Sequence, residues 1–276
     1  MDQVEVPESQ VVPIDDLDVA TGVRVLGLRI AFVNVFGVIH PDGTWTLIDA
    51  GIPFSASYIL RWADRHFHRA PNAIVLTHGH FDHVSAAGEL AEHWSVPVYA
   101  HPLEFPYLTG EKEYPKPNAG AGGGAMPLMA PMFPRGPVDL RRWLKEIPSG
   151  DGEPFEVMPG WEVLLTPGHT PGHVSFFRRS DRTLLVGDAF CTTKPEAFFE
   201  AAVAQHAELH GPPAYFTWDW AKARASVETL AGLDPKVVIP GHGKPVAGAE
   251  VAAALHKLAQ NFDRIAVPDN RKSDAA

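Results

Sequence analysis

The sequence predicts an α/β (α+β) fold in which two β-sheets pack face to face and helices cover their outer sides. Strand patterns form two groups, before residue 101 and after residue 160, and helical patterns lie between and after the strands. This order lacks the regular alternation of a parallel βαβ array. With 276 residues and 45% hydrophobic composition the chain can bury a sizeable core, and we expect one domain over residues 1–276.

The first group of strands begins near residue 23. Residues 23–51 read as consecutive strands, and the turn residues Pro41, Asp42 and Gly43 predict a hairpin between residues 32–39 and 45–48. Apolar residues then recur at helical or strand spacing in four further segments. We expect a helix at 55–67, a strand at 73–76, a helix at 86–94 and a strand at 96–100.

Regular patterns stop at residues 101–137. This segment is rich in Pro, Gly and Met, and it contains the glycine run 120–124. A loop this long in a compact domain usually has a function or is disordered. Two interpretations stay open: a flexible wall or lid over a pocket, and a mobile surface insertion.

Order returns after residue 160. We expect strands at 161–166, 174–178 and 183–186, helices at 196–209 and 220–233, a short strand at 237–239 and a closing amphipathic helix at 250–265. The polar tail after Pro268 is expected to be frayed.

The strongest chemical signal is the run Thr77-His78-Gly79-His80-Phe81-Asp82-His83, which follows the apolar strand expected at 73–76. It places four potential metal ligands within six residues. A single histidine beside a strand is usually an ordinary polar group that finds a hydrogen bond. Four titratable groups together are hard to tolerate without a charged partner, so the cluster indicates a metal site.

Three further candidate ligands share one placement, each on a loop directly after an apolar strand. His169 follows residues 164–168, Asp188 follows 184–187 and His242 follows 237–241. Loops at strand ends are where a scaffold gathers groups from distant parts of the chain. A glycine precedes each of the three, which allows a tight backbone near an ion.

With these motifs the sequence resembles the metallo-β-lactamase superfamily over nearly its whole length. The matching segments are Leu47-Ile48-Asp49-Ala50-Gly51, the His-x-His-x-Asp-His cluster, the run from Pro167 to His173, Gly187-Asp188 and Gly241-His242-Gly243. The resemblance implies a four-layer αββα sandwich. Within the superfamily the chain looks most similar to bacterial hydrolases of the glyoxalase-II-like and lactonase-like groups.

The resemblance also implies two metal ions and their ligands. His78, His80 and His169 are expected to bind one ion, Asp82, His83 and His242 the second, and Asp188 both. Imidazole and carboxylate suit zinc, and also iron or manganese. We expect two divalent ions, with zinc as the default, and a hydroxide between them as the nucleophile, so that Asp82 and Asp188 take part in catalysis.

Four other residues are weaker candidates. Asp49 is implied to support a ligand through a hydrogen bond. His173, four residues after His169, is a candidate pocket residue, although packing is the more common role. Lactonases of the superfamily often carry a substrate-contacting tyrosine near the place of Cys191, so this residue weakens a direct lactonase assignment, and a buried thiol is its ordinary interpretation. Tyr107, like Tyr114, is a candidate substrate contact from the irregular segment.

The charge composition limits the kinds of molecule that the protein is expected to bind. Lys and Arg number 23 against 33 Asp and Glu, a formal charge of -10, which opposes extended contact with nucleic acid or an anionic membrane. We therefore expect a small-molecule substrate, while the oligomeric state stays open. With a single cysteine and no visible targeting or membrane-spanning segment, we expect a cytoplasmic protein.

Several functions remain in competition. Hydrolysis of a small ester, lactone or thioester comes first, and β-lactam opening is an alternative that departs from this ligand set in its best-known groups. An iron-dependent sulfur dioxygenase is the alternative from another class. A flavodiiron protein is disfavoured by His80 and by the lack of room for a flavin domain. The acidic charge argues against a nuclease. A structural metal module would need four ligands and not seven.

Overall fold

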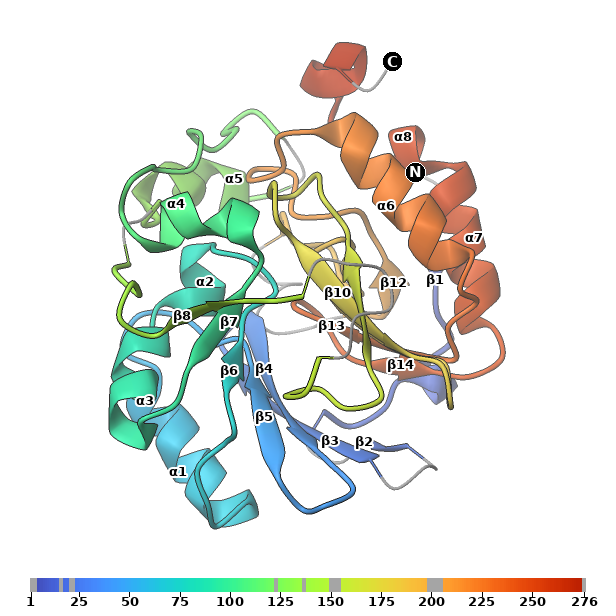
Figure 1. The fold of residues 1–276 in the computed structure, drawn as a ribbon. Coiled ribbons are helices and arrows are strands. Elements are labelled where there is room, and N and C mark those ends of the chain that lie inside the picture. Colours follow the sequence, from blue (N-terminus) through green and yellow to red (C-terminus); the bar gives the residue numbers. More distant parts are fainter. Residues whose placement is uncertain are drawn as a thin grey trace.

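The computed structural model describes residues 4–14, 17–19, 23–121, 124–135, 138–148, 155–197 and 206–274. Two sheets face each other, and helices cover the outer side of each (Figure 1). The predicted α/β class and the four-layer αββα arrangement are confirmed.

The first sheet contains the strands of the N-terminal half, in an order that follows the chain. Its strands are β2 (Leu17–Val19), β3 (Val23–Ile30), β4 (Val33–Ile39), β5 (Trp45–Ile48), β6 (Ile74–Val75), β7 (Val98–Ala100) and β8 (Leu144–Glu146). Pairing is antiparallel from β2 to β5 and parallel from β5 to β8. Parallel strands need long connections: helix α1 (Ala56–His66) lies between β5 and β6, and helix α3 (Ala87–Trp94) lies between β6 and β7.

The second sheet has the order β14-β13-β11-β10-β9. Its strands are β9 (Glu162–Leu165), β10 (Val174–Arg178), β11 (Thr183–Gly187), β13 (Val237–Pro240) and β14 (Val246–Ala247). Only β11 and β13 pair in parallel, and helix α6 (Trp220–Ala231) connects them. Helix α7 (Val251–Gln260) follows β14, and β1 (Val4–Glu5) pairs with β12 (Glu208–Leu209).

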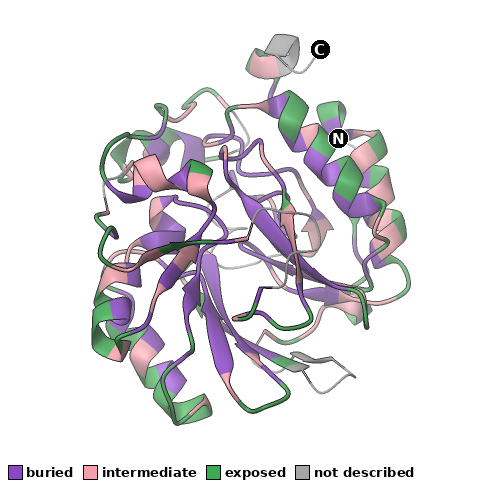
Figure 2. Cartoon of the chain, viewed as in Figure 1, coloured by how far each residue is buried: buried purple, intermediate pink, exposed green. Residues whose placement is uncertain are grey.

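The hydrophobic core explains the layers, because three clusters each fill the space between two adjacent layers. Phe36 and Val75 of the first sheet pack with Phe176 and Ile239 of the second. A second cluster joins the first sheet to α1 and α3, and a third joins the second sheet to α6 and α7. The buried residues accordingly follow the sheets and the inner sides of the helices (Figure 2).

Short helices complete the fold. They are η1 (Glu8–Gln10), α2 (Phe81–Val84), η2 (Pro102–Glu104), α4 (Phe105–Leu108), α5 (Met126–Met129), η3 (Ala130–Met132), α8 (Phe262–Ile265) and η5 (Asp269–Asp274). In the described ranges, no helix combines the length and the apolar character that crossing a bilayer requires.

Three sequence predictions need correction. The helix expected at 196–209 was predicted wrongly at its C-terminal end, because Glu208–Leu209 form strand β12. Residues 198–205 of this prediction lie outside the described part of the chain. The closing helix is interrupted at Asn261, which leaves the helical conformation between α7 and α8. The tail expected to be frayed forms the 3-10 helix η5 in the residues that are described.

Candidate metal centre

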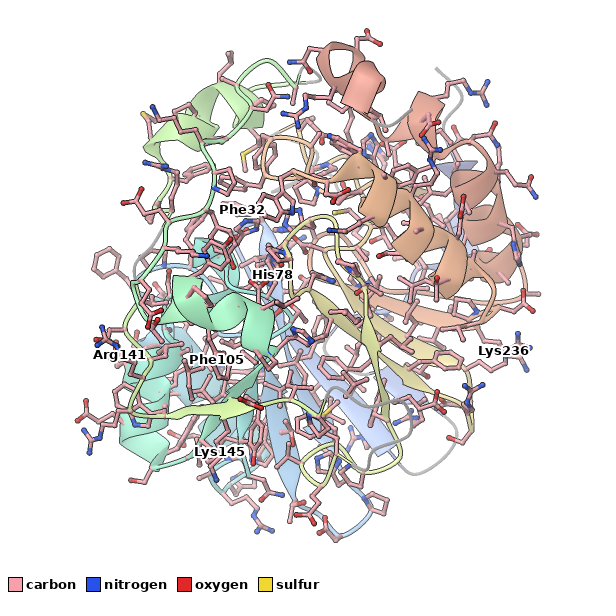
Figure 3. All side chains as sticks on the ribbon, turned by 45° about the horizontal axis from the view of Figure 1, so that its top comes forward. Phe32, His78, Phe105, Arg141, Lys145 and Lys236 are labelled. Atoms are coloured by element: carbon pink, nitrogen blue, oxygen red, sulfur yellow. The ribbon has the colours of Figure 1, made fainter. Side chains whose placement is uncertain are left out.

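The predicted ligands meet at one end of the sandwich, because the strands that carry them end there. Asp49 follows β5, His78 follows β6, Asp188 follows β11 and His242 follows β13. The loop with His169 joins β9 to β10 at the same end. Figure 3 looks toward this region, where His78 is labelled between the two halves of the molecule.

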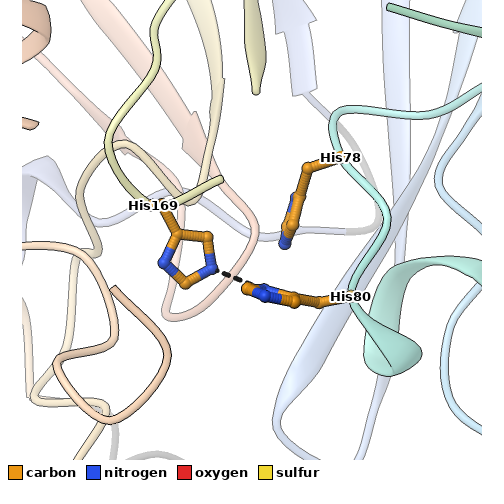
Figure 4. A group of neighbouring side chains, drawn as sticks. All are labelled: His78, His80 and His169. Carbon is orange, nitrogen blue, oxygen red and sulfur yellow. Dashed lines mark hydrogen bonds between the residues drawn. The ribbon is translucent and has the colours of Figure 1, made fainter. Parts of the chain in front are cut away.

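The first ligand group is His78, His80 and His169 (Figure 4), whose candidate ligand atoms lie within 4.8 Å of one another. His80 Nδ1 and His169 Nε2 are 2.9 Å apart. The three rings are close to perpendicular, with interplanar angles of 87°, 76° and 86°. All three side chains are buried, so their nitrogens share one small volume.

The second group is Asp82, His83 and His242, again with its ligand atoms within 4.8 Å of one another. His242 Nε2 lies 3.4 Å and His83 Nε2 lies 3.9 Å from Asp82 Oδ2. Helix α2 begins at Phe81, directly after His80, and carries Asp82 and His83. The start of this short helix therefore divides the candidate ligands of the first group from those of the second along the chain.

Asp188 lies between the two groups. Its Oδ2 atom is 3.0 Å from His242 Nε2, 3.5 Å from both His83 Nε2 and His169 Nε2, and 4.0 Å from His78 Nε2. One carboxylate oxygen thus faces imidazoles of both groups. This is the placement expected of a residue that binds two ions.

Buried polar atoms without partners show that the site fits metal ions. His78 Nε2, His83 Nε2 and Asp188 Oδ1 are buried and make no hydrogen bond to any described residue. Leaving such atoms unpaired costs about 1–3 kcal/mol each. Imidazole nitrogens and carboxylate oxygens are ligands of zinc and other transition metals, so an ion would satisfy these atoms.

The ionisation of the first group suits metal binding. Burial, with smaller contributions from neighbouring imidazoles, holds the pKa of His78 and His169 well below the usual value and lowers the pKa of His80 to about 3. These three imidazoles are therefore neutral at pH 7, which leaves a lone pair for an ion.

Mutual attraction sets the direction of the pKa shifts of His83, His242 and Asp188, whereas burial raises the pKa of Asp82. Burial alone would raise the pKa of Asp188, but the imidazoles of His242 and His83 outweigh it and hold the pKa well below its usual range. In turn the carboxylates around His83 and His242 raise the pKa of both imidazoles against the effect of burial. Asp188 is thus ionised at neutral pH.

In four of the five imidazoles, the ring nitrogen that faces away from the centre is held by the surrounding protein. Asp49 Oδ2 pairs with His83 Nδ1 at 2.7 Å and also accepts a hydrogen bond from Thr77. The other outward nitrogens meet Thr77 Oγ1 (from His78), Thr217 Oγ1 (from His169) and the carbonyl of Phe32 (from His242). Such partners fix the orientation of a ligand ring. The structure places Asp49 where the resemblance implied, against a ligand.

His173 supports the backbone of Asp188 and does not join a ligand group. Its Nε2 accepts a hydrogen bond from the Asp188 N–H at 2.8 Å, and its Nδ1 lies 2.8 Å from Thr166 Oγ1. Burial lowers the pKa of His173 to about 4, so the ring is neutral. Since both nitrogens are occupied, His173 acts as a rigid spacer between β9 and the loop with Asp188.

Two glycines allow the loops to come this close. A Cβ atom on Gly241 would lie 2.2 Å from Asp188 Oδ1. Gly187 has a φ of +57°, and a Cβ atom there would lie 2.6 Å from His173 Nε2. The predicted role of glycine beside Asp188 and His242 is therefore close approach as much as chain bending.

The weaker candidates Cys191 and Tyr107 lie in surroundings that differ from those of the seven candidate ligands. The Cys191 side chain is buried, and burial together with Asp188 raises the pKa of its thiol well above the usual value. Cys191 belongs to none of the ligand groups found in the described residues. Tyr107 stacks on Tyr114 with ring centroids 4.0 Å apart, and it is Tyr114 that contacts His80.

Sequence reasoning missed Glu104 and Thr217. Glu104 is fully buried and accepts hydrogen bonds from the backbone N–H of Gly79 and of Gly172 and from the Tyr114 hydroxyl. Thr217 meets His169. Both residues lie in segments without a recognisable motif, and a glutamate in a proline-rich stretch gives no sign that it is buried.

Comparison with known proteins assigns the family. The family model described as metallo-beta-lactamase superfamily matches residues 30–242. The probable metallo-hydrolase YflN of Bacillus subtilis is 40% identical over 250 residues, which cover 90% of this chain and 94% of that protein.

Two solved structures share the fold. A beta-lactamase domain protein from Burkholderia ambifaria superposes with a TM-score of 0.63 at 22% identity, covering 94% of this chain and 77% of that one. The di-iron-bound form of TTHA1623 gives a TM-score of 0.52 at 26% identity, covering 85% and 96% of the two chains. The family model over residues 30–242 and the 40% identity to YflN identify the chain as a member of the metallo-β-lactamase superfamily.

Proposed function

We propose that the chain is a dinuclear metal-dependent hydrolase that cleaves small esters, lactones or thioesters. The observation that carries the proposal is the convergence of five imidazoles and two carboxylates, with Asp188 facing imidazoles of both groups. A structural zinc site is closed by four ligands, so this set suits two ions that keep open positions for substrate. The name of the relative YflN, a probable metallo-hydrolase, supports the same class.

The candidate ligands would be shared between two metal ions. His78, His80 and His169 would hold one ion, Asp82, His83 and His242 the other, and Asp188 both. When bound, two divalent ions supply Lewis acidity, which activates water near neutral pH and polarises a carbonyl group. Asp82 and Asp188 would offset only part of the charge of two divalent ions, so the occupied centre would be electropositive and would suit a substrate oxygen that gains negative charge.

Among the described residues, neither the Cys191 thiol nor the Ser175 hydroxyl is available as an activated nucleophile. The Cys191 thiol is buried and keeps its proton at neutral pH because its pKa is raised. The Ser175 hydroxyl donates to the Val186 carbonyl and is committed to that bond. Water is therefore the nucleophile in this proposal.

Zinc is the proposed metal, because five imidazoles and two carboxylates suit it well. Iron would use the same ligands, and the structural relative TTHA1623 has been seen in a di-iron-bound form. Iron together with oxygen uptake would point to a sulfur dioxygenase and away from hydrolysis.

The test combines metal analysis with a substrate panel. The purified protein is assayed by elemental analysis and then with lactones, acyl thioesters, aryl esters and β-lactams. His80→Ala and Asp188→Ala are expected to abolish turnover, whereas His93→Ala, a change at an exposed histidine, leaves it intact. Wild-type rates in the first two variants, or no hydrolysis of any carbonyl substrate by the metal-loaded protein, would refute the proposal.

A further inference from the structure

We infer that four phenylalanine side chains beside the metal centre bind an apolar acyl group of the substrate. We call these residues the aromatic wall: Phe32, Phe81, Phe133 and Phe216. The inference rests on the proposed function, since it names the class of carbonyl compound that the site accepts.

The wall is continuous although its residues come from four separate segments. Phe133 is the common neighbour: its ring centroid lies 5.1 Å from Phe81, 6.4 Å from Phe32 and 6.5 Å from Phe216. Phe81 and Phe216 are 6.3 Å apart. Aromatic rings at these separations are in contact, so the four form one apolar surface.

This surface adjoins both ligand groups. The Phe216 ring lies 4.9 Å from His80 of the first group, and the Phe32 ring stacks on His242 of the second group at 6.0 Å. Phe81 follows His80 directly in the chain. Phe32 carries a label near His78 in the view toward the centre (Figure 3). A substrate whose carbonyl reaches Asp188 therefore has the wall beside it.

The four rings are held in place but are not covered. Each of them is only partly buried. Phe32, Phe133 and Phe216 pack against a small buried cluster of Met126, Ala130 and Tyr215, which is separate from the three clusters between the layers. Part of the irregular segment is thus anchored here and presents Phe133 toward the centre. A half-exposed apolar surface next to a reactive site is suited to an apolar ligand.

The chemistry of the wall selects the substrate class. Four phenyl rings offer dispersion contacts and no charge or hydrogen-bond donor, so they favour an alkyl or aryl acyl group over a short or charged one. Each methylene group buried against them should tighten binding about fourfold. The site then accepts acyl esters or thioesters with medium-length alkyl or phenyl groups in preference to acetyl compounds.

Binding of carboxylic acids tests the inference without requiring turnover. The metal-loaded protein is titrated calorimetrically with acetate, butyrate, hexanoate and phenylacetate. Hexanoate and phenylacetate are expected to bind at least about tenfold more tightly than acetate. Phe133→Ala should remove most of this difference, and Phe54→Ala, at an exposed phenylalanine outside the wall, should keep it.

The outcomes separate this inference from the proposed function. Affinity that does not increase with chain length, an equal effect of the two alanine variants, or no binding of any acid would each overturn it. If the affinity for carboxylic acids increases with acyl length but no ester is hydrolysed, the inferred acyl site is supported and only the proposed reaction is contradicted.

A different observation carries a second inference, that Glu104 is a positioning residue for the first ligand group. Its Oε2 accepts from the Gly79 N–H at 2.9 Å, between His78 and His80, and its Oε1 accepts from the Gly172 N–H at 2.6 Å, in the loop of His169. One buried side chain therefore connects the two loops that carry the three histidines.

Tyr114 completes this connection. Its hydroxyl donates to Glu104, and its ring lies 4.5 Å from the His80 ring at an angle of 62°. A Cβ atom on Gly79 would lie 2.3 Å from the Tyr114 hydroxyl oxygen, so the loop has no space to shift toward the tyrosine. Glu104 and Tyr114 thus restrict both the distance between the loops and the position of His80.

Metal affinity tests this role. Glu104→Gln places an amide NH2 group where the Gly79 N–H, the Gly172 N–H and the Tyr114 hydroxyl need acceptors. Zn²⁺ should therefore bind about 10–100-fold more weakly. Competition with a chromophoric chelator measures this affinity. Tyr114→Phe keeps both backbone contacts and should have a smaller effect. Glu196→Gln is the matched control, because Glu196 is also buried and accepts a backbone hydrogen bond, from Ala214.

Thermal unfolding of the metal-free variants separates positioning from general destabilisation. Glu104→Gln should weaken Zn²⁺ binding more than Glu196→Gln even where the two lower the melting temperature equally. Wild-type affinity in Glu104→Gln, or equal losses in both glutamine variants, would overturn the assignment.

Discussion

Asp188 Oδ2 lies within 4.0 Å of four imidazole nitrogens, those of His78, His83, His169 and His242. The position of Asp188 depends in turn on residues that are not candidate metal ligands. His173 holds its backbone N–H, and Gly241 leaves space for its Oδ1 atom. Asp49 performs a similar task for His83, with which it shares a 2.7 Å contact. At the scale of single residues, the site is therefore a set of candidate ligands whose orientation is fixed by hydrogen bonds from neighbouring residues that are not ligands.

Asp49→Asn tests the support of His83. The amide keeps the shape of the side chain but can no longer accept from both Thr77 and His83, so the imidazole loses its preferred orientation. Metal affinity should fall about 10–100-fold. Competition titration measures it, with Asp64→Asn, at an exposed aspartate, as the control. Equal affinities in the two variants would contradict this role.

His173→Ala tests the support of Asp188. The change leaves the Asp188 N–H buried without its acceptor and should destabilise the fold by about 1–3 kcal/mol. Denaturant unfolding of the metal-free protein measures the free energy of unfolding. A variant as stable as the wild type would mean that water or a neighbouring group replaces the imidazole.

At the scale of elements, the hairpin of β10 and β11 sets the position of the loop with Asp188. Asp181 in its turn accepts hydrogen bonds from the buried side chain of Arg178 and from the Thr183 N–H. Burial alone would raise the pKa of Asp181, but the Arg178 guanidinium and Thr183 outweigh it and hold the pKa below 3.8. The ionised carboxylate thus stabilises the turn.

The pH dependence of Asp181→Asn follows from that shift. Because the folded pKa is depressed, the stabilisation is fully present above the unfolded value, near 3.8, and is lost as the pH falls through the lower folded value. The melting temperature of the metal-free variant should lie below that of the wild type by a constant amount at neutral pH. The difference should shrink only in acid below pH 3.8. A difference that disappears already near neutral pH would contradict the pairing.

The lengths of the strands explain which of them could be predicted from the hydrophobic pattern of the sequence. The strands β3, β4 and β5 carry enough residues for their spacing to be read, and the sequence predicted them. The two-residue strand β12 shows no period, and its partner β1 stands at the other end of the chain, so residues 208–209 were assigned to a helix. The contacts that Glu104 and Phe133 make beside the centre depend on tertiary packing and had no local signal in the sequence.

At the scale of the whole molecule, the sandwich brings distant segments to one end. The seven candidate ligands could be named from the sequence because a histidine cluster and strand-end loops mark them. The supporting residue Glu104 could not, since its burial and its bonds to Gly79 and Gly172 exist only after both loops have folded. The aromatic wall was likewise invisible, because its four residues come from separate segments.

Metal binding should stabilise the whole fold. The ligands come from both sheets, so ions bound between them favour the folded state over the unfolded one. At a free metal concentration one hundred times the dissociation constant, one site adds about 2.7 kcal/mol. Chelator treatment should therefore lower the melting temperature and zinc should restore it. An unchanged melting temperature would place any bound metal outside the core of the fold.

Metal stoichiometry tests the central claim most directly. Purified, zinc-reconstituted protein is dialysed and analysed for metal per chain, alongside Asp188→Ala and the control His93→Ala. The convergence of seven side chains predicts two tightly bound ions in the wild type and the control, and loss of at least one in Asp188→Ala. A wild type that binds no ion, or an Asp188→Ala variant that retains both, would contradict it.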